Sequence, residues 1–181
     1  NFLKRLESSV HSFNITMDRT IKKIETLEAR LQAFLKHQSK EVEEIEQDQF
    51  LEPGEEDEEL AEAFQVGGKL KIPMKHLNIS TWMIDLQKDR EQLLILAGNA
   101  NDVTPERDAK LAELRKLIEG KVMHPTINSQ GEKNRKVIVF TAFSDTAAYL
   151  YENLEGWARD ILNVHIALVS GGTKPNRTTF G

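Results

Sequence analysis

Hydroxyl and glycine residues follow two apolar runs near the carboxyl end of the chain. Thr141 and Ser144 come after the run at residues 136–140, and Ser170 and Gly171 come after the run at residues 164–169. Hydroxyl groups, the amides of a helix's first turn and a glycine turn all bind phosphate oxygens. These residues therefore indicate a phosphate-binding edge, provided that the fold brings the two groups together.

A βαβ crossover is the fold element that would bring them together. Both apolar runs are rich in β-branched or aromatic residues, which is typical of strands buried on both faces of a parallel sheet. Ser144 is a candidate N-cap for a helix between them, with Asp145 in its first turn. The helix has an apolar stripe at Ala147, Leu150, Tyr151 and Leu154. A right-handed crossover places the loops at 141–145 and 170–173 on the edge where open α/β folds bind ligands.

The N-terminal segment has apolar residues spaced alternately by three and four. Sustained for about five heptads, this spacing predicts a single helix roughly 50 Å long with a coiled-coil seam. The seam, which only Thr20 interrupts, consists of Leu3, Leu6, Val10, Phe13, Met17, Thr20, Ile24, Leu27, Leu31 and Phe34. A second copy of the chain is one possible partner, but we favour the later helices of the same chain. They offer apolar faces at Leu86, Leu93, Leu94, Leu96, Leu111, Leu114, Leu117 and Ile118.

Two further helices have recognisable ends. Ser80 or Thr81 caps a helix that runs to about Ala97 and stops at Gly98. The triplet at 104–106 (Thr-Pro-Glu) predicts the start of another helix, which Gly120 closes. We therefore expect a helical bundle or protrusion over residues 1–122, a linker over 123–135, and an α/β unit over 136–181. The fold class is α/β overall with a large all-α part.

Charge is concentrated in one block. Residues 41–62 hold 12 acidic side chains and no basic ones, whereas the whole chain has a net charge of −5. Such a block repels itself and rarely folds alone, so residues 41–64 are interpreted as a mobile insert. The chain has no cysteine, which favours a reducing cytoplasm, and its apolar runs are too short to cross a membrane.

Three segments of the chain carry a family resemblance. They are VIVFTAFSDTAAYLYENL followed by VHIALVSGG, the N-terminal NFLKRLESSVHSFNITMDR, and LQKDREQLLILAGNANDVTPERDAKLAELRKLI. The first resembles the opening of the second RecA-like lobe in superfamily-two ATP-dependent helicases and translocases. The other two are similar to interlobe segments in a bacterial, Swi/Snf-like branch of that group. The segments occur in the family's order and cover about half of the chain.

The resemblance implies a set of nucleic-acid-binding residues. In the family, the loops after both strands lie against a nucleic-acid backbone. By that analogy the contacts are Thr141, Phe143, Ser144, Ser170, Gly171 and Gly172, and Lys4 and Arg5 are further candidates for phosphate contact. DNA is the expected partner, RNA stays open as an alternative, and the rest of the helicase chain is the implied protein partner.

The motifs of ATP hydrolysis are absent from the sequence. It has no GxxxxGK[ST] phosphate loop, no Asp-Glu pair ending an apolar strand and no arginine-rich helix start. Its five histidines are scattered without metal-ligand spacing. We therefore expect no catalytic residue, metal or cofactor in this chain, which should be inactive alone. ATP and magnesium would bind elsewhere in the parent enzyme.

The sequence thus predicts a fragment of an ATP-dependent DNA helicase or translocase. A non-enzymatic helical or coiled-coil interaction module is the main alternative, and it would form a weak homodimer through the first helix. A nucleotide-binding regulator that uses the Ser-Gly-Gly turn at 170–172 is a third class. It is disfavoured because no phosphate-loop lysine follows the turn into a helix.

Overall fold

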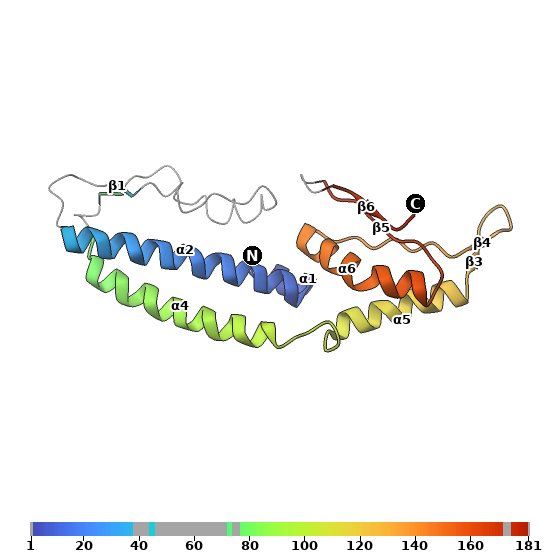
Figure 1. Cartoon of the computed structure of the whole chain (residues 1–181), viewed down its shortest axis with the longest axis horizontal. Helices are drawn as coiled ribbons and strands as arrows, with labels where there is room; N and C mark the ends of the chain where they lie inside the picture. The colour runs from blue at the N-terminus through green and yellow to red at the C-terminus, as the bar shows by residue number, and fades with distance from the viewer. Residues whose placement is uncertain (1, 38–43, 46–71, 74–76, 172–174, 181) are drawn as a thin grey trace. The chain divides into compact units, whose positions relative to one another are not determined.

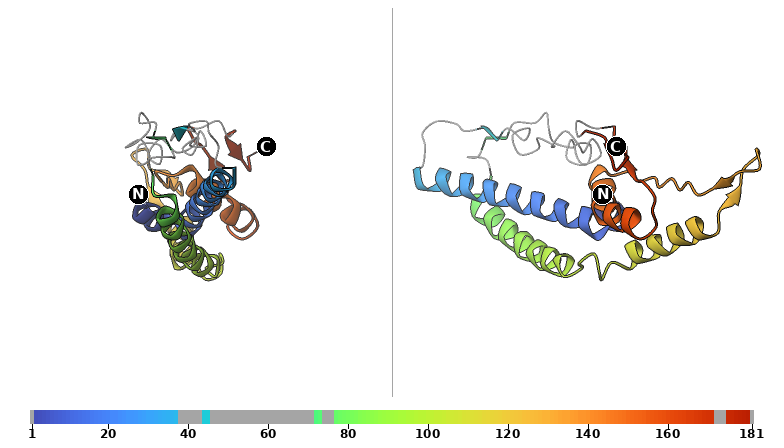
Figure 2. Two further views of the ribbon diagram at one scale, coloured as in Figure 1. Left: turned by 90° about the vertical axis from the view of Figure 1, so that its left-hand side faces the viewer. Right: turned by 45° about the vertical axis from the view of Figure 1, so that its right-hand side comes forward.

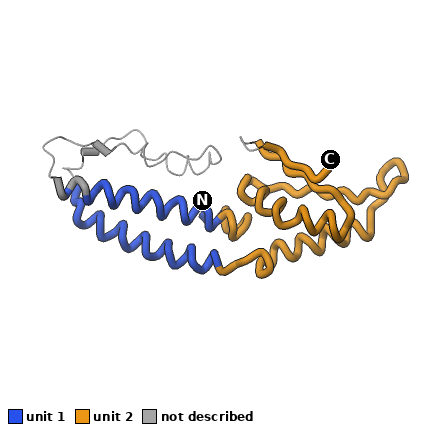
Figure 3. Tube along the Cα trace, in the orientation of Figure 1, with its two compact units in different colours: residues 1–3, 13–101 blue, residues 4–12, 102–181 orange. Residues whose placement is uncertain are grey.

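The computed structural model describes residues 2–37, 44–45, 72–73, 77–171 and 175–180. The described residues are mostly helical, with a few short antiparallel strands. They divide into two compact units (Figure 3). Unit 1 comprises residues 1–3 and 13–101, and unit 2 comprises residues 4–12 and 102–181. Most of the acidic insert expected at 41–64 lies outside the described residues.

Unit 1 is built on two helices that lie side by side (Figures 1 and 2). Helix α2 spans Val10–His37 and α4 spans Ile79–Asn101. Their core holds Leu31, Ile79, Met83 and Leu86, with Ile24, Leu27, Leu77 and Trp82 packed against it. The part of the seam at Ile24, Leu27 and Leu31 is therefore covered by a helix of the same chain, as we favoured. Its first two residues, Leu3 and Leu6, are instead 74% and 40% exposed. In addition, β1 (Glu44–Ile45) pairs antiparallel with β2 (Ile72–Pro73).

The ends of the helices differ in part from those expected. The single N-terminal helix that the seam predicted is broken at Ser9 into two helices. Helix α1 covers only Phe2–Ser8, and α2 begins at Val10. Helix α4 passes Gly98 and ends at Asn101, and Asn78 caps it by accepting the Thr81 N–H at 3.2 Å. Glycine lowers helix propensity by only about 1 kcal/mol, which tertiary packing readily overrides.

Helix α5 also begins and ends later than expected. It spans Ala109–Met123 and is capped by Asp108, whose carboxylate accepts the N–H groups of Lys110 and Leu111. The Thr-Pro-Glu triplet instead forms a turn closed by the Arg107 N–H on the Thr104 carbonyl. A carboxylate that satisfies two first-turn amides is the stronger cap, and it moves the start of the helix.

Unit 2 is built around α6, which spans Ser144–Asp160. Its apolar face packs on α5 through a core of Leu111, Tyr149 and Leu154, with Leu114, Ile118, Leu150, Trp157 and Ile166 around it. Helix α5 was expected to belong to the bundle at 1–122, but it groups with α6. Trp82 and Trp157 both lie against apolar cores.

The linker expected at 123–135 contains a hairpin. Strand β3 (Thr126–Ile127) pairs antiparallel with β4 (Lys133–Asn134). The Asn128 side chain accepts the N–H groups of Gln130 and Glu132, and Gly131 has a positive φ of 82°. Asparagine and glycine at these positions are the usual chemistry of a tight turn.

The parallel strand pair expected for residues 136–140 and 164–169 is not formed in the described residues. Residues 136–140 form no strand, and their side chains are exposed, with Ile138 76% and Phe140 90% accessible. Strand β5 covers only Ala167–Leu168 and pairs antiparallel with β6 (Arg177–Thr178). An antiparallel pair needs only a short turn, whereas parallel strands buried on both faces need further strands and a second covering layer.

The core of unit 1 yields a stability prediction. Leu31 has no exposed surface, whereas Leu35 on the same helix is 46% exposed. Leu31→Ala should lower the free energy of unfolding by about 2 to 5 kcal/mol, because it leaves a cavity against α4. Urea unfolding followed by Trp82 fluorescence, in a Trp157→Phe background, measures this locally. Leu35→Ala is the matched control. Equal urea midpoints for the two variants would show that the buried seam residue contributes no more to stability than the exposed one.

Candidate functional site

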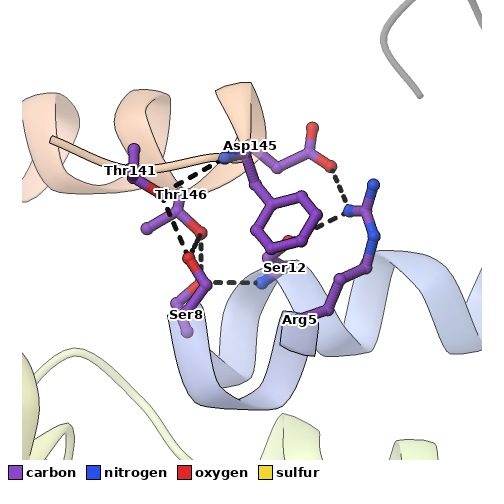
Figure 4. A network of polar contacts seen from close by, with 8 residues as sticks. Arg5, Ser8, Ser12, Thr141, Asp145 and Thr146 are labelled. Atoms are coloured by element: carbon purple, nitrogen blue, oxygen red, sulfur yellow. Dashed lines mark hydrogen bonds and ion pairs between the residues drawn. The ribbon is translucent and has the colours of Figure 1, made fainter. Parts of the chain in front are cut away.

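The break between α1 and α2 brings polar side chains to one place. Ser9 lies at the break and caps α2, since its Oγ accepts the Ser12 N–H at 3.0 Å. Its own N–H donates to the Arg5 carbonyl at 2.9 Å, which completes the last turn of α1. The residues around this break turn toward the start of α6 in Figure 4.

The start of α6 is capped differently from the sequence prediction. Phe143, not Ser144, occupies the N-cap position, with φ −117° and ψ 124°, and its side chain makes no capping bond. Ser144 is instead the first helical residue. Thr141 steadies this turn by accepting the Phe143 N–H on Oγ1 at 3.3 Å.

A buried ion pair joins the two segments. Nη1 of Arg5 lies 3.1 Å from Oδ2 of Asp145, and the two side chains are 2% and 5% exposed. The same Nη1 donates to the Ser12 Oγ at 3.0 Å, and the guanidinium carbon lies 4.6 Å from the centroid of the Phe143 ring. Because Arg5 is buried in this pair, a direct phosphate contact by Arg5 would require the pair to open.

A chain of hydroxyl groups lies beside the ion pair (Figure 4). Ser8 Oγ is 3.1 Å from Thr141 Oγ1 and 2.9 Å from Thr146 Oγ1. Ser9 Oγ is also 2.9 Å from Thr146 Oγ1. Ser9 and Thr146 are buried, at 4% and 3% exposed, whereas Ser8 and Thr141 are partly exposed.

A second cluster of polar and aromatic side chains connects α2 and α6 with the N-cap of α5. The Tyr149 hydroxyl donates to Oδ2 of Asp108 at 2.9 Å, and the His11 ring stacks on the Tyr149 ring with centroids 4.8 Å apart. Burial raises the pKa of Tyr149 above its ordinary value of 10.0, and the hydrogen bond to Asp108 and its charge add to the shift. Asp108 therefore serves both as the cap of α5 and as the acceptor for α6.

The remaining predicted residues lie elsewhere in the described chain. Ser170 follows β5, and its N–H donates to the Asn176 side chain at 3.1 Å. Gly171 is exposed, with nothing within 4 Å of where a Cβ would stand. Gly172 lies outside the described residues. Lys4 is exposed on α1. The structure thus brings together Arg5, Thr141 and Phe143, while Ser170 and Gly171 belong to the β5–β6 hairpin.

Sequence reasoning missed the role of several residues in this site. Ser8, Ser9 and Thr146 form the hydroxyl chain, and Asp145 neutralises Arg5. Asp145 had been assigned only to a helix's first turn. The high density of short polar side chains at 8–12 and 141–146 could have indicated this site, because such a density is unusual on packed helix faces.

Within the described residues, no group of three or more His, Cys, Asp or Glu side chains is placed to hold a metal ion. None of the described helices combines the length and the apolar character that a membrane span requires. Comparison with protein-family models, with curated proteins and with solved structures finds no match to this chain.

The ion pair leads to a stability prediction. Arg5→Met should lower the free energy of unfolding by about 3 to 5 kcal/mol, because it removes the cation that pairs with the buried Asp145 carboxylate. Asp145→Asn in the same background should recover part of this loss. Urea unfolding of the two single variants and the double variant gives the coupling energy. Lys4→Met, an exposed neighbour on α1, should change stability by no more than about 0.5 kcal/mol. Additive single effects would contradict the coupling.

The raised pKa of Tyr149 makes stability dependent on alkaline pH. The unfolded chain releases a phenolic proton near pH 10, whereas the folded chain holds it at higher pH. The resulting stability is present below about pH 10 and is lost as the pH rises beyond it. In Tyr149→Phe this decline should therefore be smaller, as measured by urea unfolding between about pH 8 and 11. Tyr151→Phe, which keeps Tyr149, is the control and should retain more of the decline. An alkaline decline in Tyr149→Phe as large as that of the unmodified chain would exclude Tyr149 as a cause.

Proposed function

We propose that this chain is part of an ATP-dependent DNA helicase or translocase. It would contribute the helices between the two RecA-like lobes and the segment that opens the second lobe. RNA in place of DNA is the alternative substrate. ATP and magnesium would bind to other parts of the parent enzyme and supply the energy of movement. The reducing cytoplasm is the proposed compartment, on the absence of cysteine.

One observation carries this proposal. The two segments that resemble the family at the N-terminus and at residues 137–154 contact each other directly. Arg5 pairs with Asp145, 140 positions along the chain, and Ser8 contacts Thr141 and Thr146. If the resemblance of the two segments were due to chance, there would be no reason for them to share a buried contact of matched charges.

The exposed apolar run at 136–140 supports the same proposal. Val137 is 42%, Ile138 76%, Val139 46% and Phe140 90% exposed. Four consecutive apolar residues accessible to this degree favour a strand that further strands cover in a larger assembly. We propose that those strands belong to the second lobe, and that the parallel βαβ unit forms there.

The chain's own residues would then act in three ways. Thr141 and Ser144, at the positive end of the α6 dipole, would hold a backbone phosphate without reading the base. The Arg5–Asp145 pair would hold this loop against α1. Helices α2 and α4, packed along their shared core, would form a stiff spacer between the lobes.

DNA binding tests the proposal. The chain should bind single-stranded DNA with an affinity that falls as salt rises, because phosphate contacts release counterions. Gly171→Asp puts a negative charge in the loop after β5, where open space accepts the side chain, and should weaken binding about tenfold. Gly98→Asp, which adds the same charge on α4 in equally open space, is the matched control and should stay within about twofold. Fluorescence anisotropy at several salt concentrations measures both.

Two outcomes would contradict the proposal. One is the absence of any salt-dependent binding by the unmodified chain. The other is an equal loss of affinity in Gly171→Asp and Gly98→Asp, which would indicate a general charge effect rather than a contact near the hairpin.

A further inference from the structure

The hydroxyl chain beside the ion pair carries more hydrogens than its internal hydrogen bonds use. Three oxygen–oxygen contacts link four hydroxyl groups in series, in the order Ser9, Thr146, Ser8 and Thr141. At each end of the series a hydroxyl oxygen accepts a hydrogen bond from a backbone N–H. The Ser12 N–H donates to Ser9 Oγ, and the Phe143 N–H donates to Thr141 Oγ1. The backbone groups at the ends are donors, so they take up no hydroxyl hydrogen.

One hydroxyl hydrogen is left over. Each hydroxyl group carries a single hydrogen, and each contact between two oxygens uses one. Four hydroxyl groups therefore bring one hydrogen more than the three contacts use. Whichever way the bonds are directed, one member of the chain must donate to an acceptor outside it.

Burial decides which member this is. An unsatisfied donor on Ser9 or Thr146, which are 4% and 3% exposed, would be strongly unfavourable, because it would be cut off from water. Ser8 and Thr141 are partly exposed residues, so a hydrogen placed there is less costly than one on the buried pair. The arrangement of lowest free energy puts the surplus hydrogen on Ser8 or Thr141.

We infer that Ser8 and Thr141 together form a hydrogen-bond donor site for one phosphate oxygen of a nucleic-acid strand. This inference rests on the proposed function and adds Ser8, from a helix near the other end of the chain, to the binding residues. The two hydroxyl groups are interchangeable as donors, because the surplus hydrogen can lie on either. Ser9 and Thr146 do not contact the phosphate, and they only complete the hydrogen bonds at the buried end of the hydroxyl series.

The helix dipole at the start of α6 favours an anion at this site. The nearby carboxylate of Asp145 is paired with Arg5 at 3.1 Å, so it does not leave uncompensated negative charge. Thr141 lies just before the N-cap of α6, a helix of 17 residues, where the helix dipole is positive.

Interchangeable donors predict a particular pattern of affinities. Ser8→Ala and Thr141→Val each leave one donor, so each should weaken single-stranded DNA binding by at most about twofold. The double variant has none and should lose about tenfold or more, beyond the product of the single effects. Thr141→Ser keeps the hydroxyl group and should bind like the unmodified chain.

The buried pair supplies the matched control. Ser9→Ala with Thr146→Val removes the same number of hydroxyl groups but leaves the donor, so its affinity should stay within about twofold. If that double variant does not fold, as judged by its helical circular dichroism, Ser9→Ala alone serves in its place.

The outcomes separate this inference from the proposed function. If the unmodified chain binds DNA and the Ser8→Ala, Thr141→Val double variant binds equally well, only this inference is wrong. It is also wrong if the buried-pair variant loses as much affinity as the exposed pair. If the unmodified chain binds no DNA, both proposals fail.

Discussion

The buried contact between Arg5 and Asp145 joins segments that lie 140 positions apart in the sequence. An ion pair with side chains only 2% and 5% exposed tolerates little separation, because either charge alone in the interior is strongly unfavourable. It therefore keeps α1 at the start of α6. The stacking of Arg5 on the Phe143 ring and the hydroxyl contacts of Ser8 with Thr141 both require that placement.

Helix α6 connects the rest of unit 2 to this contact. Its first turn carries Asp145 and Thr146, and its apolar face packs on α5. Arg177 of β6 reaches its other side, 3.3 Å from the Glu152 carboxylate and 4.4 Å from the centroid of the Tyr151 ring. The exposed run at 136–140 leads directly into this helix. A single helix thus links the candidate site, the core and the apolar run proposed to join a larger sheet.

Local patterns in the sequence predicted the helices well and their ends less well. The spacing of Leu111, Leu114 and Ile118 indicated the buried face of α5 correctly, since helical periodicity is a property of neighbouring residues. Three other leucines expected on apolar faces are exposed, namely Leu94 at 46%, Leu96 at 47% and Leu117 at 64%. The cap of α5 was placed at Thr104, but Asp108 satisfies two amides and prevails. The strand at 136–140 was expected from residue types that favour sheets. Forming a sheet depends on neighbours that these residues do not find in the described chain.

The helical character of the chain and the concentration of hydroxyl groups at 8–12 and 141–146 can be read directly from the sequence. These follow from local periodicity and side-chain chemistry. The pairing of Arg5 with Asp145, the contact of Ser8 with Thr141, and the packing of α5 on α6 become visible only in the folded chain. Contacts over such separations depend on how helices dock, and short-range patterns in the chain do not encode the choice of docking partner.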